Sequence, residues 1–471
     1  MKNAFAPINR IPPEVLTLIP DYCWWHRDNG PIAVILTHVC RAWREIFSSH
    51  SSLWTEFDCL NADKTRVYLE RSKSSPINLW ILRKNGLSPN DPLLQVIPHA
   101  TSRLKYLYVS AMPENVGDIT IHLSHPAPLL EDLSIDCADG PGAPSNFVLP
   151  PSLFNGDLSS LHTLSLGSVR TNVPWRNMVN LTSFCLRHIP PGDISIGQLL
   201  DFFESAPRLK NVDLECATPV SGAQRGRFVQ LKCLKWMGIQ GAEPCSLLLD
   251  HLLIPVGAKV EIRTYSPGSR LEAHLPRSLR NFRNLSNLNK ISLTLDVHLV
   301  MKFTGPHGKL SLDCPEPPDS TTSQVFEYLA RIDTSRIEQL EVFGGNPPSR
   351  DLPHQVLLRM KNLRILALYQ CRGLHLFIRA LHPDVNSSEV VVCPDLGELI
   401  LAPLTNGRVF DINDLVSMAT ARASVWANLG NVRIICRQDE VDLGDLLELR
   451  KHVPDVECGL MEFDSEGSEE G

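Results

Sequence analysis

The hexapeptide LEDLSI, residues 130–135, carries apolar side chains at its first, fourth and sixth positions. Ten other stretches repeat this frame of apolar residues at relative positions 0, 3 and 5. All the copies together begin at Leu104, Leu130, Leu161, Leu181, Leu209, Leu231, Leu288, Ile337, Leu363, Leu396 and Leu429. Successive side chains of a β-strand point to opposite faces, so positions 3 and 5 share a face and position 4 points away. Each copy therefore predicts a short strand that buries one face.

The spacing of the copies predicts how these strands are joined. Two wide gaps hold degenerate copies, from Gly257 and from His307, and with these included successive copies start 19 to 33 residues apart. Leucine-rich repeats have a period of about 20 to 29 residues, with one strand in each. Apolar residues spaced three and four apart predict helical returns at 196–206, 323–332 and 354–360. We expect an α/β fold, a leucine-rich-repeat solenoid in which parallel strands stack and helices return the chain.

Some positions within the frames have predicted roles. The residue between the two buried positions should face outward, where it is either solvated or available to another protein. These outward residues include Ser134, Ser165, Asp213, Lys235, Ser292 and Glu341. Cys371 lies where leucine-rich repeats often place Asn or Cys, a residue that bonds the loop backbone, so we expect it to be structural.

The composition is that of an ordinary globular protein, with 43% hydrophobic and 21% charged residues. A net charge of −7 gives no general attraction to nucleic acid or to anionic membranes, so neither partner is expected. The 13 cysteines form no CxxC pair, which is typical of reduced thiols. No secretory signal opens the sequence, and no apolar run approaches the roughly 18 residues that span a bilayer. These features predict a protein of the cytoplasm, the nucleus or both.

The segment from residue 8 to residue 54 differs from the repeats because it is rich in tryptophan and aliphatic residues. RIPPEVLTLI (10–19) and VCRAWREIF (39–47) have the apolar spacing of short helices. PIAVILTHV (31–39) fits a helix or a strand equally well. About fifty residues bury too small a fraction of their surface to enclose so many apolar groups. We expect some of them to face the repeats or another protein.

This N-terminal segment resembles an F-box. The family's pattern opens with Leu-Pro-x-Glu-Ile and continues to a Val-Cys-x-x-Trp helix and a Leu-Trp pair. The matching residues here are Ile11, Pro12, Glu14, Val15, Val39, Cys40, Trp43, Leu53 and Trp54. The continuation RVYLERSKSSPINLWI (66–81), followed by the repeats, is similar to many F-box proteins of mushroom-forming fungi. One departure is the aromatic insert at 20–31, which is longer than the pattern expects.

The resemblance implies a small all-α, three-helix unit that docks onto the Skp adaptor of a Skp–cullin–F-box ubiquitin ligase, while the repeats capture an unknown target protein. The implied adaptor-binding residues are Ile11, Pro12, Val15, Leu16, Ile19, Val39, Trp43, Leu53 and Trp54. For Trp43 and Trp54, a purely internal role is an equal alternative. The organisation would be an F-box-like helical domain at 1–60, a connecting segment at 61–103, the solenoid at 104–461 and an acidic disordered tail at 462–471.

The common catalytic motifs GxSxG, HExxH and GxxxxGK[ST] do not occur in the sequence. TGPHGKLS (304–311) resembles a phosphate loop but has two residues instead of four between its glycines, so we expect a turn between two strands. His122 and His125 have no accompanying cysteine or carboxylate set, so we expect a surface pair. We predict a non-catalytic protein without cofactor or metal. The alternative to a ligase subunit is an interaction scaffold whose N-terminal helices only cap the repeats.

Overall fold

The computed structural model has a mixed α/β fold with 17 strands in a mostly parallel sheet. It describes residues 10–19, 32–59, 61–83, 92–137, 147–170, 178–190, 192–219, 226–265, 270–315, 321–347, 349–383, 391–403, 411–436 and 442–459. The insert at 20–31 and the acidic tail expected at 462–471 lie outside these residues. The chain divides into two compact units, Met1–Ala217 and Thr218–Gly471, which are described one at a time.

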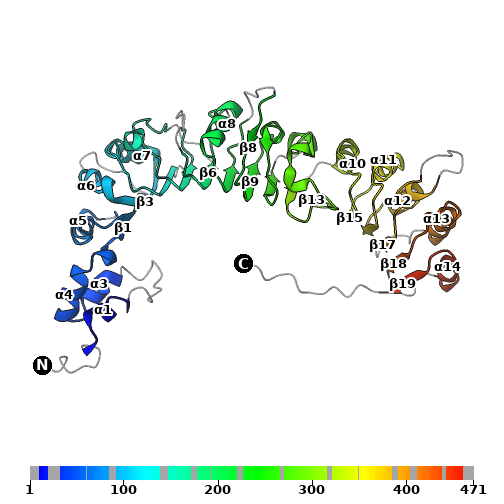
Figure 1. Ribbon diagram of the computed structural model, residues 1–471, viewed down its shortest axis with the longest axis horizontal. Coiled ribbons are helices and arrows are strands. Elements are labelled where there is room, and N and C mark those ends of the chain that lie inside the picture. The colour runs from blue at the N-terminus through cyan, green and yellow to red at the C-terminus, as the bar shows by residue number, and fades with distance from the viewer. Residues whose placement is uncertain are drawn as a thin grey trace. The chain divides into compact units, whose positions relative to one another are not determined.

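The first unit begins with short helices and continues as a strand ladder (Figure 1). Its helical elements are α1 Pro13–Leu16, α3 Ile32–Thr37, α4 Arg41–Ser49, η4 Ser51–Trp54, α5 Ala62–Arg71, α6 Pro92–Ala100, η5 Thr101–Arg103, α7 Pro113–His122, η6 Leu153–Gly156 and α8 Ile196–Ser205. Its strands are β1 Glu56–Asp58, β2 Ile77–Arg83, β3 Leu104–Ala111, β4 Asp132–Cys137, β5 Thr163–Gly167, β6 Ser183–Arg187 and β7 Asn211–Glu215. PIAVILTHV, for which helix and strand were both open, contains the helix α3.

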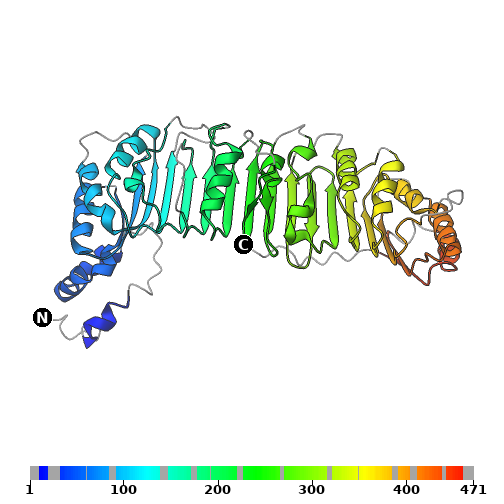
Figure 2. The same cartoon turned by 45° about the horizontal axis from the view of Figure 1, so that its top comes forward.

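The strands of the first unit pair in chain order, from β1 to β7, and every pairing is parallel. Burial alternates along them as the frame predicts: in β4, Leu133 and Ile135 are buried while Ser134 is not. Figure 2 shows the strands side by side with helices α6, α7 and α8 along one face. The ladder starts earlier than the first complete frame, because β1 and β2 precede Leu104 and β2 pairs with β3. Residues 61–103 therefore contribute a strand to the sheet.

The second unit has more strands and a longer row of helices. Its strands are β8 Val229–Gln230, β9 Trp236–Gly241, β10 Leu252–Leu253, β11 Lys259–Thr264, β12 Lys290–Leu295, β13 Leu299–Thr304, β14 Lys309–Cys314, β15 Gln339–Gly344, β16 Ile365–Tyr369, β17 Glu398–Ala402, β18 Asn431–Ile435 and β19 Asp455–Gly459. Its helical elements are α9 Ser246–Leu249, η7 Leu271–Ala273, η8 Leu279–Asn281, η9 Arg283–Leu285, α10 Thr321–Arg331, α11 Asp351–Arg359, α12 Leu374–Leu381, α13 Ile412–Ser424 and α14 Leu443–Leu449. The three predicted helical returns correspond to α8, α10 and α11.

Strand order in the second unit departs from the all-parallel stack that the repeats predict. The order is β9, β11, β14, β13, β12 and β15, followed by β16 to β19 in sequence. β13 is antiparallel to both neighbours because the loops on either side of it are short, and a short loop joins only antiparallel strands. TGPHGKLS forms the predicted turn, with the Gly305 amide donating to the Gly308 carbonyl at 3.0 Å.

One predicted frame was placed wrongly. The copy at Leu231 expects Leu234 and Trp236 to be the buried strand residues. Instead, β9 begins at Trp236, which is half-buried, and the buried pair is Met237 and Ile239. Trp236 turns its indole N–H toward Glu261 Oε2, at 3.4 Å. The aromatic ring of Trp236 matches the apolar frame in the sequence. Its indole N–H, however, needs a hydrogen-bond partner, which it finds on the sheet face opposite the helices.

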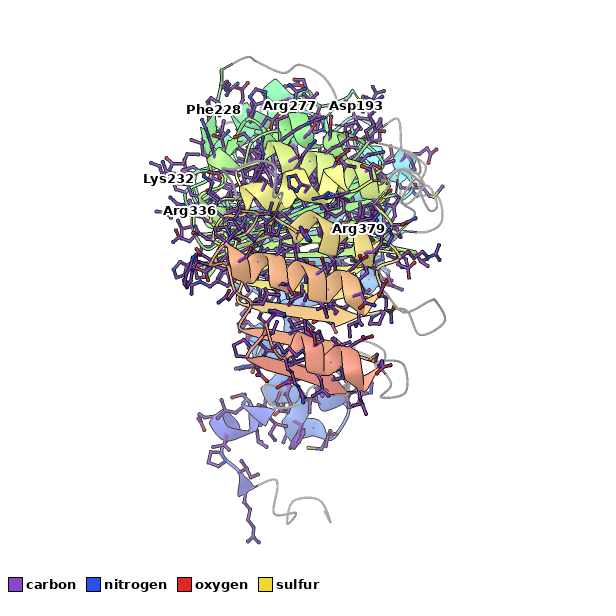
Figure 3. The ribbon with its side chains drawn as sticks, turned by 90° about the vertical axis from the view of Figure 1, so that its right-hand side faces the viewer. Asp193, Phe228, Lys232, Arg277, Arg336 and Arg379 are labelled. Atoms are coloured by element: carbon purple, nitrogen blue, oxygen red, sulfur yellow. The ribbon has the colours of Figure 1, made fainter. Side chains whose placement is uncertain are left out.

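The loops that precede the mutually parallel strands, all except β13, lie at one common edge of the second unit's sheet. Figure 3 labels Lys232 and Arg336, which precede β9 and β15, along the same side of the view. At the opposite ends of the strands, Cys371 is buried and its Sγ lies 3.5 Å from the carbonyl oxygens of Val342 and Tyr369. Burial raises its pKa to about 12, so the thiol stays neutral. The predicted structural role of this cysteine is confirmed.

Candidate functional site

The N-terminal helices enclose a small apolar core. Its buried members are Leu16 on α1, Leu36 on α3, and Trp43 and Phe47 on α4. Partly buried apolar side chains surround them: Ile11, Ile19, Ile32, Cys40, Ile46 and Leu53. The spacing of Trp43 and Phe47 puts them on one face of α4, where their rings meet edge to face at 5.3 Å. This core is filled by the chain itself.

Helix α4 starts where the sequence supplies an extended residue that can accept a hydrogen bond. Cys40 has φ −159° and ψ 175°, and its Sγ accepts a hydrogen bond from the Trp43 amide at 3.5 Å. Val39 therefore lies before the helix, with its side chain 53% exposed. The indole Nε1 of Trp43 is buried and has no hydrogen-bond partner within the described residues.

Trp54 joins the N-terminal helices to the next helix of the chain. Its indole N–H donates to the Phe47 carbonyl at 2.8 Å, and the residue is 1% exposed. Its ring meets that of Tyr68 edge to face at 5.0 Å, and the Arg71 guanidinium lies over it at 4.3 Å. Tyr68 and Arg71 belong to α5, so α5 covers part of the apolar surface that the N-terminal segment cannot enclose.

Other apolar side chains of these helices and of the residues next to them remain open to solvent. Val15 and Leu18 are each 50% exposed, Ile35 is 44% exposed, and Val39 is more exposed still. Single exposed apolar residues are ordinary on protein surfaces, but four from so short a segment make it a candidate for contact with another protein.

The predicted adaptor-binding residues fall into three groups in the structure. Pro12, Val15 and Val39 are exposed and available to a partner. Ile11, Ile19 and Leu53 are half-buried against the core, and Leu16, Trp43 and Trp54 are buried within the chain. Two exposed residues were not predicted, Leu18 and Ile35. Leu18 lies three residues after Val15 and could have been identified by helical spacing, whereas Ile35 needed α3 to be known as a helix.

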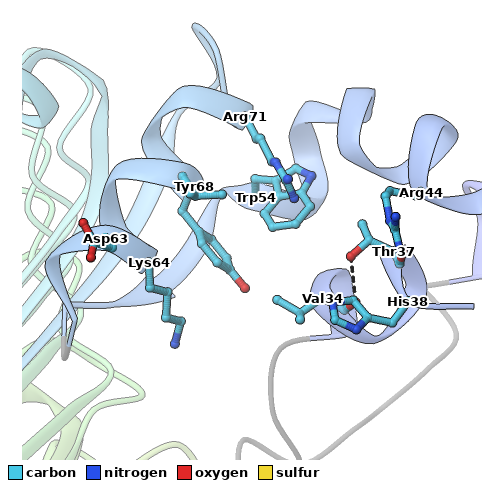
Figure 4. Close-up of a pocket in the computed structure, with 10 residues that line it drawn as sticks. Val34, Thr37, His38, Arg44, Trp54, Asp63, Lys64, Tyr68 and Arg71 are labelled. Carbon is cyan, nitrogen blue, oxygen red and sulfur yellow. Dashed lines mark hydrogen bonds between the residues drawn. The ribbon is translucent and has the colours of Figure 1, made fainter. Parts of the chain in front are cut away.

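A pocket of about 370 Å³ lies between α3 and α5 (Figure 4). Val34 and His38 line one side, Lys64 and Tyr68 line the other, and Trp54 lies between them. Lys64 Nζ is 2.9 Å from Asp58 Oδ2. Burial and, to a smaller extent, the Asp58 charge raise the pKa of Tyr68 to about 12, against the opposing effect of Arg71. An apolar wall with a cationic rim suits the side chain of a binding partner, and the phenol is too weak an acid for proton transfer near neutral pH.

Within the described residues, no group of three or more His, Cys, Asp or Glu side chains is placed to hold a metal ion. No helix in that part of the chain has both the length and the apolar character needed to cross a bilayer.

The sequence matches no protein-family model, and it matches none of the curated proteins.

Proposed function

We propose that this chain is the substrate-recognition subunit of a Skp–cullin–F-box ubiquitin ligase. The observation that carries the proposal is the set of four exposed apolar side chains, Val15, Leu18, Ile35 and Val39, in a helical segment whose own core is already filled. An adaptor that lays apolar residues against them would remove this surface from water. The residues that resemble an F-box lie in the same segment, so the partner expected there is the Skp adaptor.

The fold supports the two parts of this proposal. The helices α1, α3 and α4 form the F-box-like unit, and the strand ladder with helices on one face forms a leucine-rich-repeat solenoid. Repeats of this kind present outward side chains from many neighbouring strands, a surface suited to binding another protein. The target would be held there, in the cytoplasm or the nucleus.

The mechanism requires no reacting group from this chain. Holding a target lysine near the ubiquitin-charged conjugating enzyme raises the effective concentration of one reactant at the other. The chain would therefore act by binding two proteins at once, with catalysis supplied by the rest of the ligase.

A second candidate function is a scaffold in which the N-terminal helices only cap the ladder. The contact of Trp54 with Tyr68 and Arg71 favours this alternative, since it ties the helices to α5. Under that alternative, a chain lacking residues 1–54 would expose the end of the ladder and lose strand structure measured by circular dichroism. Under the ligase proposal, the shortened chain keeps its strands and loses adaptor binding, with loosening confined to α5, against which Trp54 packs.

The direct test measures capture of the purified Skp adaptor by the full chain and by surface variants. We expect Val15→Asp and Val39→Asp to weaken binding by roughly tenfold or more, because each places a charge in an apolar contact. Val297→Asp is a matched control, since Val297 is 72% exposed in the second unit, and it should bind as the parent does. If the parent chain fails to capture the adaptor, the proposal is rejected.

A further inference from the structure

Two cysteine sulfurs lie in contact on the last two strands of the second unit, β18 and β19 (Figure 1). Cys436 directly follows β18, Cys458 lies on β19, and their Sγ atoms are 3.7 Å apart. The structure has no disulfide between them. The sulfurs of a disulfide are about 2.05 Å apart, so these two need to approach each other by only about 1.7 Å to become bonded.

The backbone of the sheet holds the two residues in this arrangement. β18 and β19 run parallel, and Ile434 is the register partner of Cys458. Ile434 and Cys436 are two residues apart, so their side chains leave the sheet on one face, which Cys458 shares. The Cys436 amide also donates to the Gly459 carbonyl at 3.2 Å. The contact between the sulfurs therefore follows from the pairing of the strands.

The two thiols differ in how far a solvent molecule can reach them. Cys458 is half-buried, so a molecule as small as hydrogen peroxide has access to its side chain. Cys436 is only 6% exposed. Thiols that respond to oxidants often come in such pairs, in which an accessible cysteine is oxidised first and a resolving cysteine beside it then forms the disulfide.

Other thiols of the second unit lie against carbonyl groups instead. Cys245 Sγ donates to the His274 carbonyl at 3.0 Å, and Cys393 Sγ donates to the Leu357 carbonyl at 3.1 Å. Burial raises the pKa of each thiol to about 12. Both stay protonated near neutral pH and are poor nucleophiles, because the thiolate is the reactive form. Oxidation should therefore favour the contacting pair over these buried thiols.

We propose that Cys436 and Cys458 form a reversible oxidation site, which hydrogen peroxide converts to a disulfide. The Cys458 sulfur first attacks one peroxide oxygen: an S–O bond forms, the O–O bond breaks, and the leaving oxygen takes the thiol proton and departs as water. Cys458 is then a sulfenic acid. The Cys436 sulfur attacks the Cys458 sulfur next: the S–S bond forms, the S–O bond breaks, and the hydroxyl leaves with the Cys436 proton as a second water. The two thiols lose two electrons in all, and peroxide gains them.

The disulfide ties the last strand of the ladder to its neighbour. It closes a loop over residues 437–457, which include helix α14. A repeat at the end of a ladder is held by one neighbour only, so it opens more easily than the repeats inside. A cross-link restricts those open conformations. The oxidised chain should keep α14 and β19 closed where the reduced chain lets them open. The reaction needs no adaptor, so it holds or fails independently of the ligase proposal.

The first test treats the full chain with a small molar excess of hydrogen peroxide. Remaining thiols are then blocked with iodoacetamide, and the chain is digested with trypsin without reductant. Trypsin places Cys436 in residues 434–437 and Cys458 in residues 452–471. We expect mass spectrometry to find these two peptides joined, at a mass two hydrogens below their sum. Cys458 oxidised to the sulfinic acid, with no joined peptide, overturns the proposal.

A mixture of isotope-labelled and unlabelled chains tests whether the bond forms within one molecule. We expect every joined pair of peptides to be either fully labelled or fully unlabelled. Pairs of mixed label in the proportion expected for random pairing overturn the proposal. Cys436→Ser tests the order of the steps, since it should leave Cys458 as a sulfenic acid that dimedone labels.

Hydrogen exchange measures the effect on the end of the ladder. Peptides covering 443–459 should exchange roughly ten to a hundred times more slowly in the oxidised chain, because the closed loop restricts local opening. Dithiothreitol should restore the faster rate. Cys458→Ser should show neither the joined peptide nor the slower exchange. Cys233→Ser is the matched control, since this thiol is exposed in the same unit, and it should respond as the parent does. Equal exchange in the oxidised and reduced chains overturns the proposed closing of α14 and β19.

Discussion

Replacing Trp54 by alanine tests whether this residue belongs to the interior of the chain or to a partner interface. Its side chain is 1% exposed and fills the space between α4 and α5. The substitution removes the edge-to-face contact with Tyr68, the hydrogen bond to the Phe47 carbonyl and the stacking of Arg71. We therefore expect a large loss of local stability before any partner is present.

The expected magnitude follows from the burial of Trp54. Truncating a fully buried tryptophan to alanine costs about 3–5 kcal/mol, which already includes the lost contacts and the cavity that remains. Each 1.4 kcal/mol is about a factor of ten in an equilibrium constant. Amide exchange through local opening of α4 and α5 should then accelerate by roughly two to three and a half orders of magnitude.

Hydrogen exchange followed by mass spectrometry on the full chain measures this effect in peptides that cover 41–54 and 62–71. Trp426→Ala is the matched control, because that tryptophan is 93% exposed and its loss should change nothing. Unchanged protection in α4 and α5 of the Trp54 variant would refute the argument, since it would show that the residue does not hold the two helices together.

Three further predictions concern the sheet and its buried groups. Arg422→Met should lower the free energy of unfolding by about 3 kcal/mol or more, seen as a lower urea midpoint, because the buried guanidinium donates to the carbonyls of Ala427, Val392 and Cys393. Gly308→Ala should lower the free energy of unfolding by about 1–3 kcal/mol, measured by calorimetry, because the added Cβ would lie 2.5 Å from Asn284 Cβ. Gly397→Ala is the control and should be tolerated, because its added Cβ meets nothing closer than 3.8 Å. Burial raises the pKa of Asp213, against the lowering effect of Arg187, so its ionisation is less favourable in the folded state than in the unfolded chain. Asp213→Asn should therefore raise the urea midpoint at pH 7, and this gain should shrink as the pH falls through the raised pKa and vanish below 3.8, where both states come to hold the proton.

The regular part of the sheet could be predicted because one face of each strand is buried. At Leu133 and Ile135, or Leu340 and Val342, the alternation of apolar residues alone gives the register. The reversed strand β13 was not predicted, although its loops contain the reason. A turn between LVMKF and KLSL is too short for a parallel crossover, so recognising that turn should also have fixed the antiparallel pairing.

The candidate site was less predictable because a sequence pattern does not tell which surface an apolar residue meets. Trp54 and Val39 both match the F-box pattern. In the structure, Trp54 is enclosed by α5, whereas Val39 is exposed. The difference comes from Tyr68 and Arg71, which belong to a segment that the repeats do not include. Only the folded chain brings α5 against η4. The structure is therefore needed to tell the apolar residues that pack inside the chain from those that remain exposed to a partner.

The most direct test of the central claim is a calorimetric titration of the full chain with the purified Skp adaptor at several temperatures. If the exposed residues Val15, Leu18, Ile35 and Val39 form the docking surface, the two proteins bind with a negative heat-capacity change, which is the signature of apolar burial. Val39→Asp should weaken the binding and reduce that change. The absence of heat at every temperature would contradict the account, as would a parent chain and a Val39→Asp variant that bind identically.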